Sequence, residues 1–142
     1  MESPNGLCRM DAVTLARQIR TTSVSAREVI NAVLARMEKL QAILHAFCIP
    51  TPDVARKQAD QIEKAIMAGE DVGPLAGAPV GIKALVCTAG IRTVSGSIAS
   101  KEFVPDEDDI VVERLKNAGA IILGKTNAPE FGYSGVVPAA SW

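Results

Sequence analysis

Lys83 is the residue whose surroundings point most directly to chemistry. It lies in the run PVGIKALV, residues 79–86, where every other residue is apolar, glycine or proline. A strand this apolar is usually covered on both faces, as in a parallel or mixed sheet. Its lysine either extends the amine to water along an apolar stem or lies in a site of low dielectric. Burial favours the uncharged amine, which can act as a base. The run by itself favours the exposed, structural lysine.

Hydroxyl and polar side chains follow two apolar strands in positions that could share a crevice with Lys83. The first group lies ten to fourteen residues after Lys83, in a loop rich in Gly, Ser and Thr, and consists of Thr93, Ser95 and Ser97. Open α/β sheets bind ligands at the carboxyl ends of their strands, and a loop folded back there would present these hydroxyls. Local turn hydrogen bonds are their ordinary role. Asn127 and Glu130 follow the second strand and face the same crevice if the strands are parallel.

Two other motifs are weaker. Residues 119–126, GAIILGKT, formally match the G-x-x-x-x-G-K-T phosphate loop. That loop must be flexible and open a helix, whereas Ala-Ile-Ile-Leu predicts a strand and Pro129 soon follows. A P-loop nucleotide binder is therefore a remote alternative. His45 is the single histidine, no serine is placed near it, and residues 132–135, GYSG, are not a nucleophile elbow, so a Ser–His–acid triad is disfavoured.

Composition excludes several classes of protein. The 142 residues carry a formal net charge of -1, which gives no nucleic-acid footprint. Three scattered cysteines support neither a zinc site nor a disulfide framework. The acidic run 106–109 fits a helix N-terminus better than a metal cluster. With no signal peptide and no bilayer-spanning apolar run, the sequence predicts a soluble, cytoplasmic protein without membrane contact.

The periodicity of the apolar residues predicts the α/β fold class. Capping residues and 3–4 spacing indicate helices over 11–20, from Ser25 to about Leu44, from Pro52 to about Ala68, and over 108–118. Short apolar runs indicate strands over 46–49, 79–86 and 120–123. The last two strands and the helix between them have the form of a right-handed βαβ unit. Residues 1–9 are expected to be a flexible tail, and residues 10–142 to belong to one domain.

Several motifs, in order along the chain, resemble the amidase signature family. The run 73–83, GPLAGAPVGIK, is similar to that family's G-P-L-x-G-x-P-x-x-x-K, and the run 88–97, TAGIRTVSGS, continues the similarity. Residues 119–132, GAIILGKTNAPEFG, resemble the family's A-G-A-x-x-x-G-K-T-N-x-P-E-F. The helix start VSAREVI at 24–30 and HAF at 45–47 resemble it as well. The resemblance extends from about residue 10 to residue 136.

The resemblance implies part of a large mixed-sheet fold, with N-terminal helices followed by a βαβ unit. It also implies an amide hydrolase or the A subunit of a glutamyl-tRNA(Gln) amidotransferase, acting on a small amide without cofactor or metal. The family uses a Ser–cis-Ser–Lys triad, and Lys83 matches its lysine base. The substrate-cleft candidates are then Thr93, Ser95, Ser97, Asn127 and Glu130.

Two departures from the family pattern limit what the chain can do alone. Family members usually carry an acid after the lysine, where this chain has Ala84. The glycine- and serine-rich segment that supplies the bridging serine and the nucleophile does not occur in these 142 residues. We therefore expect a truncated domain that is inactive by itself. The alternative is a non-catalytic fragment or interaction module, which would self-associate through exposed sheet edges.

Overall fold

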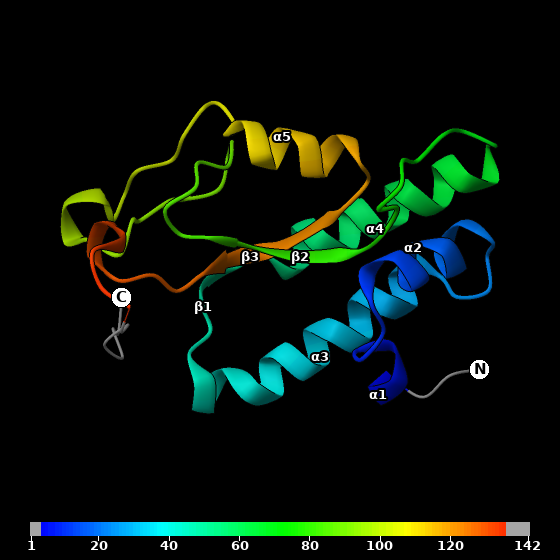
Figure 1. The fold of residues 1–142 in the computed structure, drawn as a ribbon, viewed down its shortest axis with the longest axis horizontal. Coiled ribbons are helices and arrows are strands. Elements are labelled where there is room, and N and C mark those ends of the chain that lie inside the picture. The colour runs from blue at the N-terminus through cyan, green and yellow to red at the C-terminus, as the bar shows by residue number, and fades with distance from the viewer. Residues whose placement is uncertain (1–3, 136–142) are drawn as a thin grey trace.

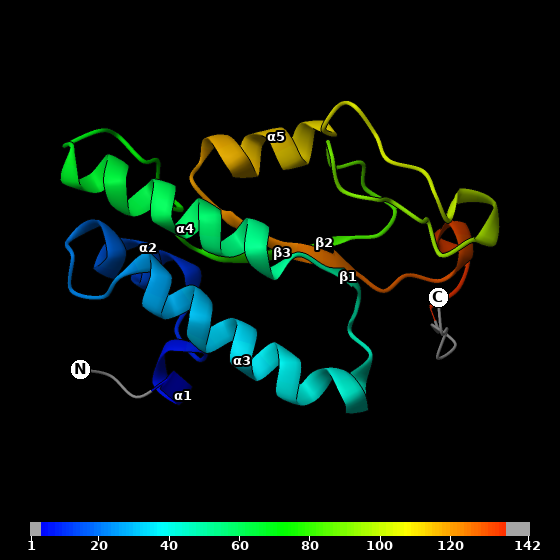
Figure 2. The same ribbon diagram turned by 180° about the vertical axis from the view of Figure 1, so that it is seen from behind.

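The computed structural model describes residues 4–135 and has the α/β architecture predicted from the sequence. Three strands form one sheet, in the order β1-β3-β2. Figures 1 and 2 show α5 on one side of the strands and α2 and α3 on the other. The elements in chain order are α1 (Pro4–Leu7), α2 (Ala12–Arg20), α3 (Ala26–Leu44), β1 (Phe47–Pro50), α4 (Pro52–Met67), β2 (Pro79–Lys83), η1 (Ile98–Ser100), α5 (Ile110–Asn117), β3 (Ile121–Thr126) and η2 (Glu130–Gly132).

The helices begin at the residues that the capping patterns predict. The Asp11 carboxylate accepts a hydrogen bond from the Thr14 amide at 2.9 Å, and Ser25 Oγ accepts one from the Glu28 amide at the same distance. Pro52 opens α4, where a missing N–H costs least. The amino-terminal segment differs from the flexible tail that we expected. Residues 4–7 form α1, because Leu7 is an apolar anchor that packs, 3% exposed, into the core under α2 and α3.

Two apolar layers enclose the sheet. The larger layer joins the helices α1 to α4 to one face of β3, where Ile121 and Leu123 lie. The smaller layer lies under α5 and is built around Ile82, Val112 and Ile122. All residues of β3 but the last are buried, so β3 is the central strand, whereas β2 is only partly covered. The apolar run containing Lys83 is thus an edge strand among residues 4–135, and the doubly covered strand is β3.

β3 pairs with β2 on one side and with β1 on the other. β2 and β3 are parallel, as the βαβ pattern predicts, and β1 is antiparallel to β3. The register of the parallel pair shifts after Val80, because Val80 is opposite Ile122 whereas Gly81 is opposite Gly124. Leu123 is therefore an extra residue in β3, which is the definition of a β-bulge.

Gly124 makes this bulge possible. Its φ is +137°, and a Cβ built on it would lie 2.3 Å from the Ile49 carbonyl oxygen and 2.8 Å from the Pro50 Cα. Both contacts are to the backbone of β1, which cannot move aside as a side chain can. The glycine that completes the apparent phosphate loop therefore serves strand packing.

Gly124→Ala is expected to lower the free energy of unfolding by about 3–5 kcal/mol, because backbone strain and a backbone clash add together. Gly90→Ala is the matched control, since Gly90 has φ +72° with no atom within 4 Å of a built Cβ. It should cost only the strain, about 1–2 kcal/mol. Urea denaturation of the two variants measures the difference, and equal losses would contradict the packing role of Gly124.

Candidate functional site

Lys83 is the last residue of β2 and lies at the carboxyl end of the parallel pair. It pairs with Thr126 of β3, and its backbone carbonyl accepts a hydrogen bond from the Val86 amide at 3.0 Å, which closes a tight turn directly after the strand. The residue is exposed. The sequence left open whether Lys83 is exposed to water or lies in a site of low dielectric. Among the described residues, it is exposed. The Lys83 amine is therefore reachable by a substrate or by a covering segment.

The Gly/Ser/Thr-rich loop folds back over the carboxyl ends of β2 and β3, as the sequence led us to expect. The Ser95 amide donates to the Ala84 carbonyl at 2.9 Å, and the Ser95 carbonyl accepts from the Phe131 amide at 2.8 Å. A small apolar cluster of Ala84, Val94 and Ala128 lies beneath it. Figures 1 and 2 show η1 and η2 side by side beyond the ends of the strands. The loop is thus fixed from both strands.

The five predicted cleft residues are only partly brought together. Ser97 is buried, and its hydroxyl donates to the exposed Glu130 carboxylate at 2.7 Å. Ser95, two residues before Ser97, is half-buried, with φ +49°. Thr93 is buried and is not bonded to this pair, because its hydroxyl binds a different polar group that is described below. Asn127 lies apart: its side-chain amide donates to the His45 carbonyl at 3.4 Å, on the side of β1.

Lys125 is the buried amine of this region, and the sequence interpretation missed it. Its side chain is fully buried, and the ammonium donates to the Val86 carbonyl, to Thr88 Oγ1 at 3.0 Å and to Thr93 Oγ1 at 2.9 Å. Three acceptors match the three donors of a lysine ammonium. Burial lowers the pKa of Lys125 from the usual 10.5 to about 8, and the neighbouring ionisable groups, among them Asp109 and Asp108, partly offset this effect.

Lys125 was missed because the predicted strand ended at residue 123, whereas β3 continues to Thr126. Strict alternation along β3 would place Lys125 on the face of Ile121 and Leu123. The extra residue shifts the register, so that Lys125 is opposite Ile82 and shares its side of the sheet. That side carries α5 and the segment 86–93. The signal available in the sequence was a glycine directly before a lysine in an otherwise apolar strand.

Two acidic residues fasten the same segment to the start of α5. Asp109 accepts from the Cys87 amide at 2.6 Å, and Asp108 accepts from the Ala89 amide at 2.7 Å and from Lys116 Nζ at 2.7 Å. Burial opposes ionisation of Asp108, but the bonds from Lys116 and Ala89 outweigh it and lower the pKa of Asp108. The acidic run expected at a helix N-terminus therefore also anchors the loop that follows Lys83.

No cluster of three or more His, Cys, Asp or Glu within residues 4–135 is arranged to hold a metal ion. In the same part of the chain, no helix is both long and apolar enough to cross a membrane.

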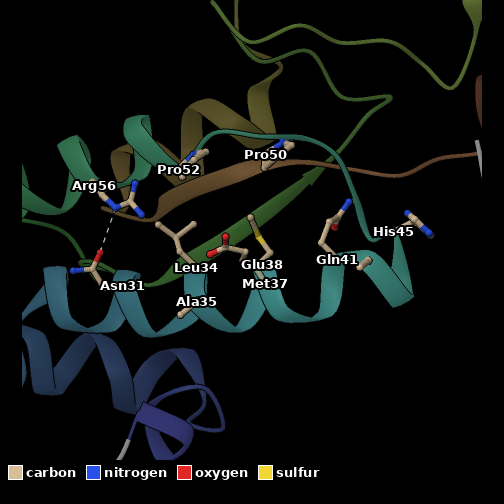
Figure 3. Close-up of a pocket in the computed structure, with 11 residues that line it drawn as sticks. Asn31, Leu34, Ala35, Met37, Glu38, Gln41, His45, Pro50, Pro52 and Arg56 are labelled. Carbon is tan, nitrogen blue, oxygen red and sulfur yellow. Dashed lines mark hydrogen bonds between the residues drawn. The ribbon is translucent and has the colours of Figure 1, made fainter. Parts of the chain in front are cut away.

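A cavity of about 790 Å³ lies away from this site, between α3 and the start of α4. Figure 3 shows Leu34 and Met37 directed toward Pro50 and Pro52 across it, with the Arg56 guanidinium bonded to Asn31 at 3.4 Å. None of the predicted site residues lines this cavity. It therefore gives no support to any of the predicted roles.

Comparison with known proteins identifies what this fold resembles. The family model described as Amidase matches residues 28–138. The A subunit of the glutamyl-tRNA(Gln) amidotransferase of Prochlorococcus marinus (strain MIT 9303) is 48% identical over 115 residues, which are 81% of this chain and 24% of that protein. The chain thus spans about a quarter of the length of the curated relatives it matches.

Solved structures agree with the sequence relatives. The peptide amidase of Stenotrophomonas maltophilia matches with a TM-score of 0.80 and 32% identity, over 87% of this chain and 26% of that one. A bacterial aryl acylamidase of the amidase signature family matches with a TM-score of 0.84 and 28% identity, over 90% of this chain and 27% of that one.

The buried ammonium of Lys125 predicts a pH dependence of stability. The folded-state pKa of about 8 lies below the unfolded value of 10.5, so the unfolded chain binds more protons between these two pH values. The free energy of unfolding of the wild type relative to Lys125→Met should therefore be constant below about pH 7 and rise from pH 8 to pH 10, by at most about 1.4 kcal/mol per pH unit. Urea titrations of both proteins across this range measure it. A difference that stays flat or falls would contradict the assignment.

Proposed function

Because the chain belongs to the amidase family, we propose that it supplies Lys83 as the base for cleavage of a carboxylic amide C–N bond. The bridging serine and the nucleophilic serine of the Ser–cis-Ser–Lys triad would come from residues that these 142 do not include. The observation that carries the proposal is the position of Lys83. Lys83 is exposed at the carboxyl end of a parallel strand pair, and the loop that follows it is hydrogen-bonded to Ala84 and Phe131, in the segments after the two strands.

The chemistry asked of Lys83 is a proton relay. The uncharged amine accepts a proton from the bridging hydroxyl, which takes the proton of the nucleophilic hydroxyl as that oxygen attacks the amide carbon. The tetrahedral intermediate then expels the amine, which receives the proton back, and water hydrolyses the acyl-enzyme by the same relay. A segment covering Lys83 would exclude water and favour the uncharged amine that the first step needs.

The Ser97–Glu130 pair and Ser95 support the proposal by shaping the loop beside Lys83. The hydrogen bond at 2.7 Å joins the loop after β2 to the segment after β3 and so holds the two segments together. Thr93 accepts a hydrogen bond from Lys125 in the same loop. Asn127 lies apart from this group, and its backbone amide donates to the Ala46 carbonyl at 2.8 Å, on the side of β1.

Ala84 stands where family members usually carry an acidic residue, and its surroundings suit a small apolar side chain. It is fully buried and packs with Val94 and Ala128 beneath the loop. A carboxylate at this position would have to be accommodated among small apolar side chains, which is costly without a partner. The loop over Lys83 is therefore held here by apolar packing and by backbone hydrogen bonds.

A chimera tests the proposed role of Lys83. Residues 28–135 replace the matching segment in the A subunit of the Prochlorococcus marinus amidotransferase, and the chimera is assayed in its complex for amide transfer from glutamine. We expect activity in the chimera and a loss of at least about 10³-fold in Lys83→Ala, because the relay then lacks its base. Lys57→Ala, which alters an exposed lysine of α4, is the matched control and should retain activity.

The 142-residue chain alone should release no product from aryl amides or glutamine, since the two serines of the proposed triad are not among its residues. The role of Lys83 is refuted by a folded chimera that is inactive before any substitution, or by activity that survives Lys83→Ala.

The alternative function, an interaction module, is supported by uncovered surface. Among residues 4–135, β1 and β2 are edge strands, and apolar side chains beside the strand ends are exposed: Ile98, Phe131 and Tyr133. Edges and apolar patches of this kind promote association between chains.

We expect the chain to self-associate in the micromolar range, as measured by sedimentation velocity. The double substitution Phe131→Ser and Tyr133→Ser should weaken this association, whereas Val13→Ser, which alters an equally exposed residue of α2, should not. A monomer that melts cooperatively at all concentrations would count against the module.

A further inference from the structure

Lys125 is the only buried ammonium among the described residues, and its three hydrogen bonds all go to the segment after Lys83. Val86 and Thr88 lie directly after the turn at the end of β2, and Thr93 lies where the chain returns toward the strands. The Lys125 side chain, on the central strand, therefore binds both ends of the loop formed by residues 84–93. No other polar side chain in residues 4–135 bonds to both ends.

The contacts continue from Lys125 to the backbone of Lys83. Lys125 Nζ binds the Val86 carbonyl, and the Val86 amide donates to the Lys83 carbonyl at 3.0 Å. On the other side, the loop containing Thr93 reaches Ser95, whose amide donates to the Ala84 carbonyl at 2.9 Å. The residue after Lys83 and the turn that closes on Lys83 are thus both held in a framework centred on the Lys125 ammonium.

We propose that Lys125 is a positioning residue for the amide-cleaving base. By binding Val86, Thr88 and Thr93, its ammonium fixes the turn after β2 and with it the direction of the Lys83 amine. This inference rests on the proposed function of Lys83. Lys125 itself touches no substrate, because its three donors are used within the protein and its side chain is fully buried.

Loss of the ammonium would leave the buried Thr88 and Thr93 hydroxyl oxygens without the donor they accept from, and the Val86 carbonyl with only the long bond from Thr88 Oγ1 at 3.4 Å. The Val86 carbonyl and the two threonine hydroxyls would then compete for the remaining backbone donors, and the segment 84–93 would rearrange. A shift of about 1 Å at a reacting group can cost about 100-fold in rate. A positioning role therefore predicts a fall in kcat with little change in KM, because the predicted cleft residues Ser97, Asn127 and Glu130 lie outside the segment that rearranges.

The first measurement uses the 142-residue chain. In Lys125→Met, amide hydrogen exchange of residues 84–97 should accelerate at least about 10-fold, while exchange in α3 changes less than about 2-fold. Thr93→Val, which removes one acceptor and keeps the shape, should show part of this effect. Thr93→Ser keeps the hydroxyl and should behave like the wild type. Lys57→Met is the control for a lysine substitution outside the framework.

The second measurement uses the chimera described above. Lys125→Met should lower kcat about 10- to 100-fold with KM within about 2-fold, Thr93→Val should lower kcat less, and Thr93→Ser should restore it. Equal acceleration of exchange in α3 and in residues 84–97 would show a merely structural role and overturn the inference. So would an unchanged kcat in Lys125→Met when Lys83→Ala is inactive. Activity that survives Lys83→Ala would instead refute the proposed function, and the inference with it.

Discussion

The close approach of β1 to Gly124 is the constraint on which the rest of the site depends. A Cβ at this position would clash with the Ile49 carbonyl and the Pro50 backbone, and the φ of +137° is one that residues with a side chain rarely adopt. The resulting bulge turns Lys125 to the side of α5 rather than to the helices α3 and α4. Every polar contact that Lys125 makes to the segment after Lys83 follows from this one change of register.

The two lysines of the parallel pair consequently have opposite environments. Lys125 is enclosed, and each of its donors has an acceptor. Its ammonium therefore stays charged, although burial disfavours the charged form. Lys83, one residue beyond Ile82, is exposed at the edge. A reactive amine must be reachable, whereas a structural one must be saturated with acceptors. The arrangement thus divides two tasks between two chemically identical side chains.

Electrostatics and small-residue packing cooperate in holding the loops. Asp108 and Asp109 bind the backbone amides of residues 89 and 87, and Lys116 neutralises Asp108. Beneath the loop, Ala84 and Ala128 allow close contact with Val94. The hydrogen bonds to Asp108 and Asp109 thus hold residues 87–89, and the apolar contacts hold Ala84 and Val94. The segments beside Lys83 are therefore each held from two sides.

The sequence by itself determined the helices, the parallel strand pair and the family, because capping residues, periodicity and ordered motifs are local properties. Asp11, Ser25 and Pro52 stand at the starts of helices, because a helix start depends on residues close to it in the sequence. The sequence also placed Ser97 and Glu130 at the same end of the parallel pair, where they are hydrogen-bonded, but it extended the strand of Lys83 to residue 86, whereas β2 ends at Lys83. Only the tertiary structure decided which lysine is buried, that Asn127 turns toward β1, and that Leu7 joins the core. These depend on a bulge imposed by a neighbouring strand and on contacts between distant segments, which alternation along a single strand does not encode.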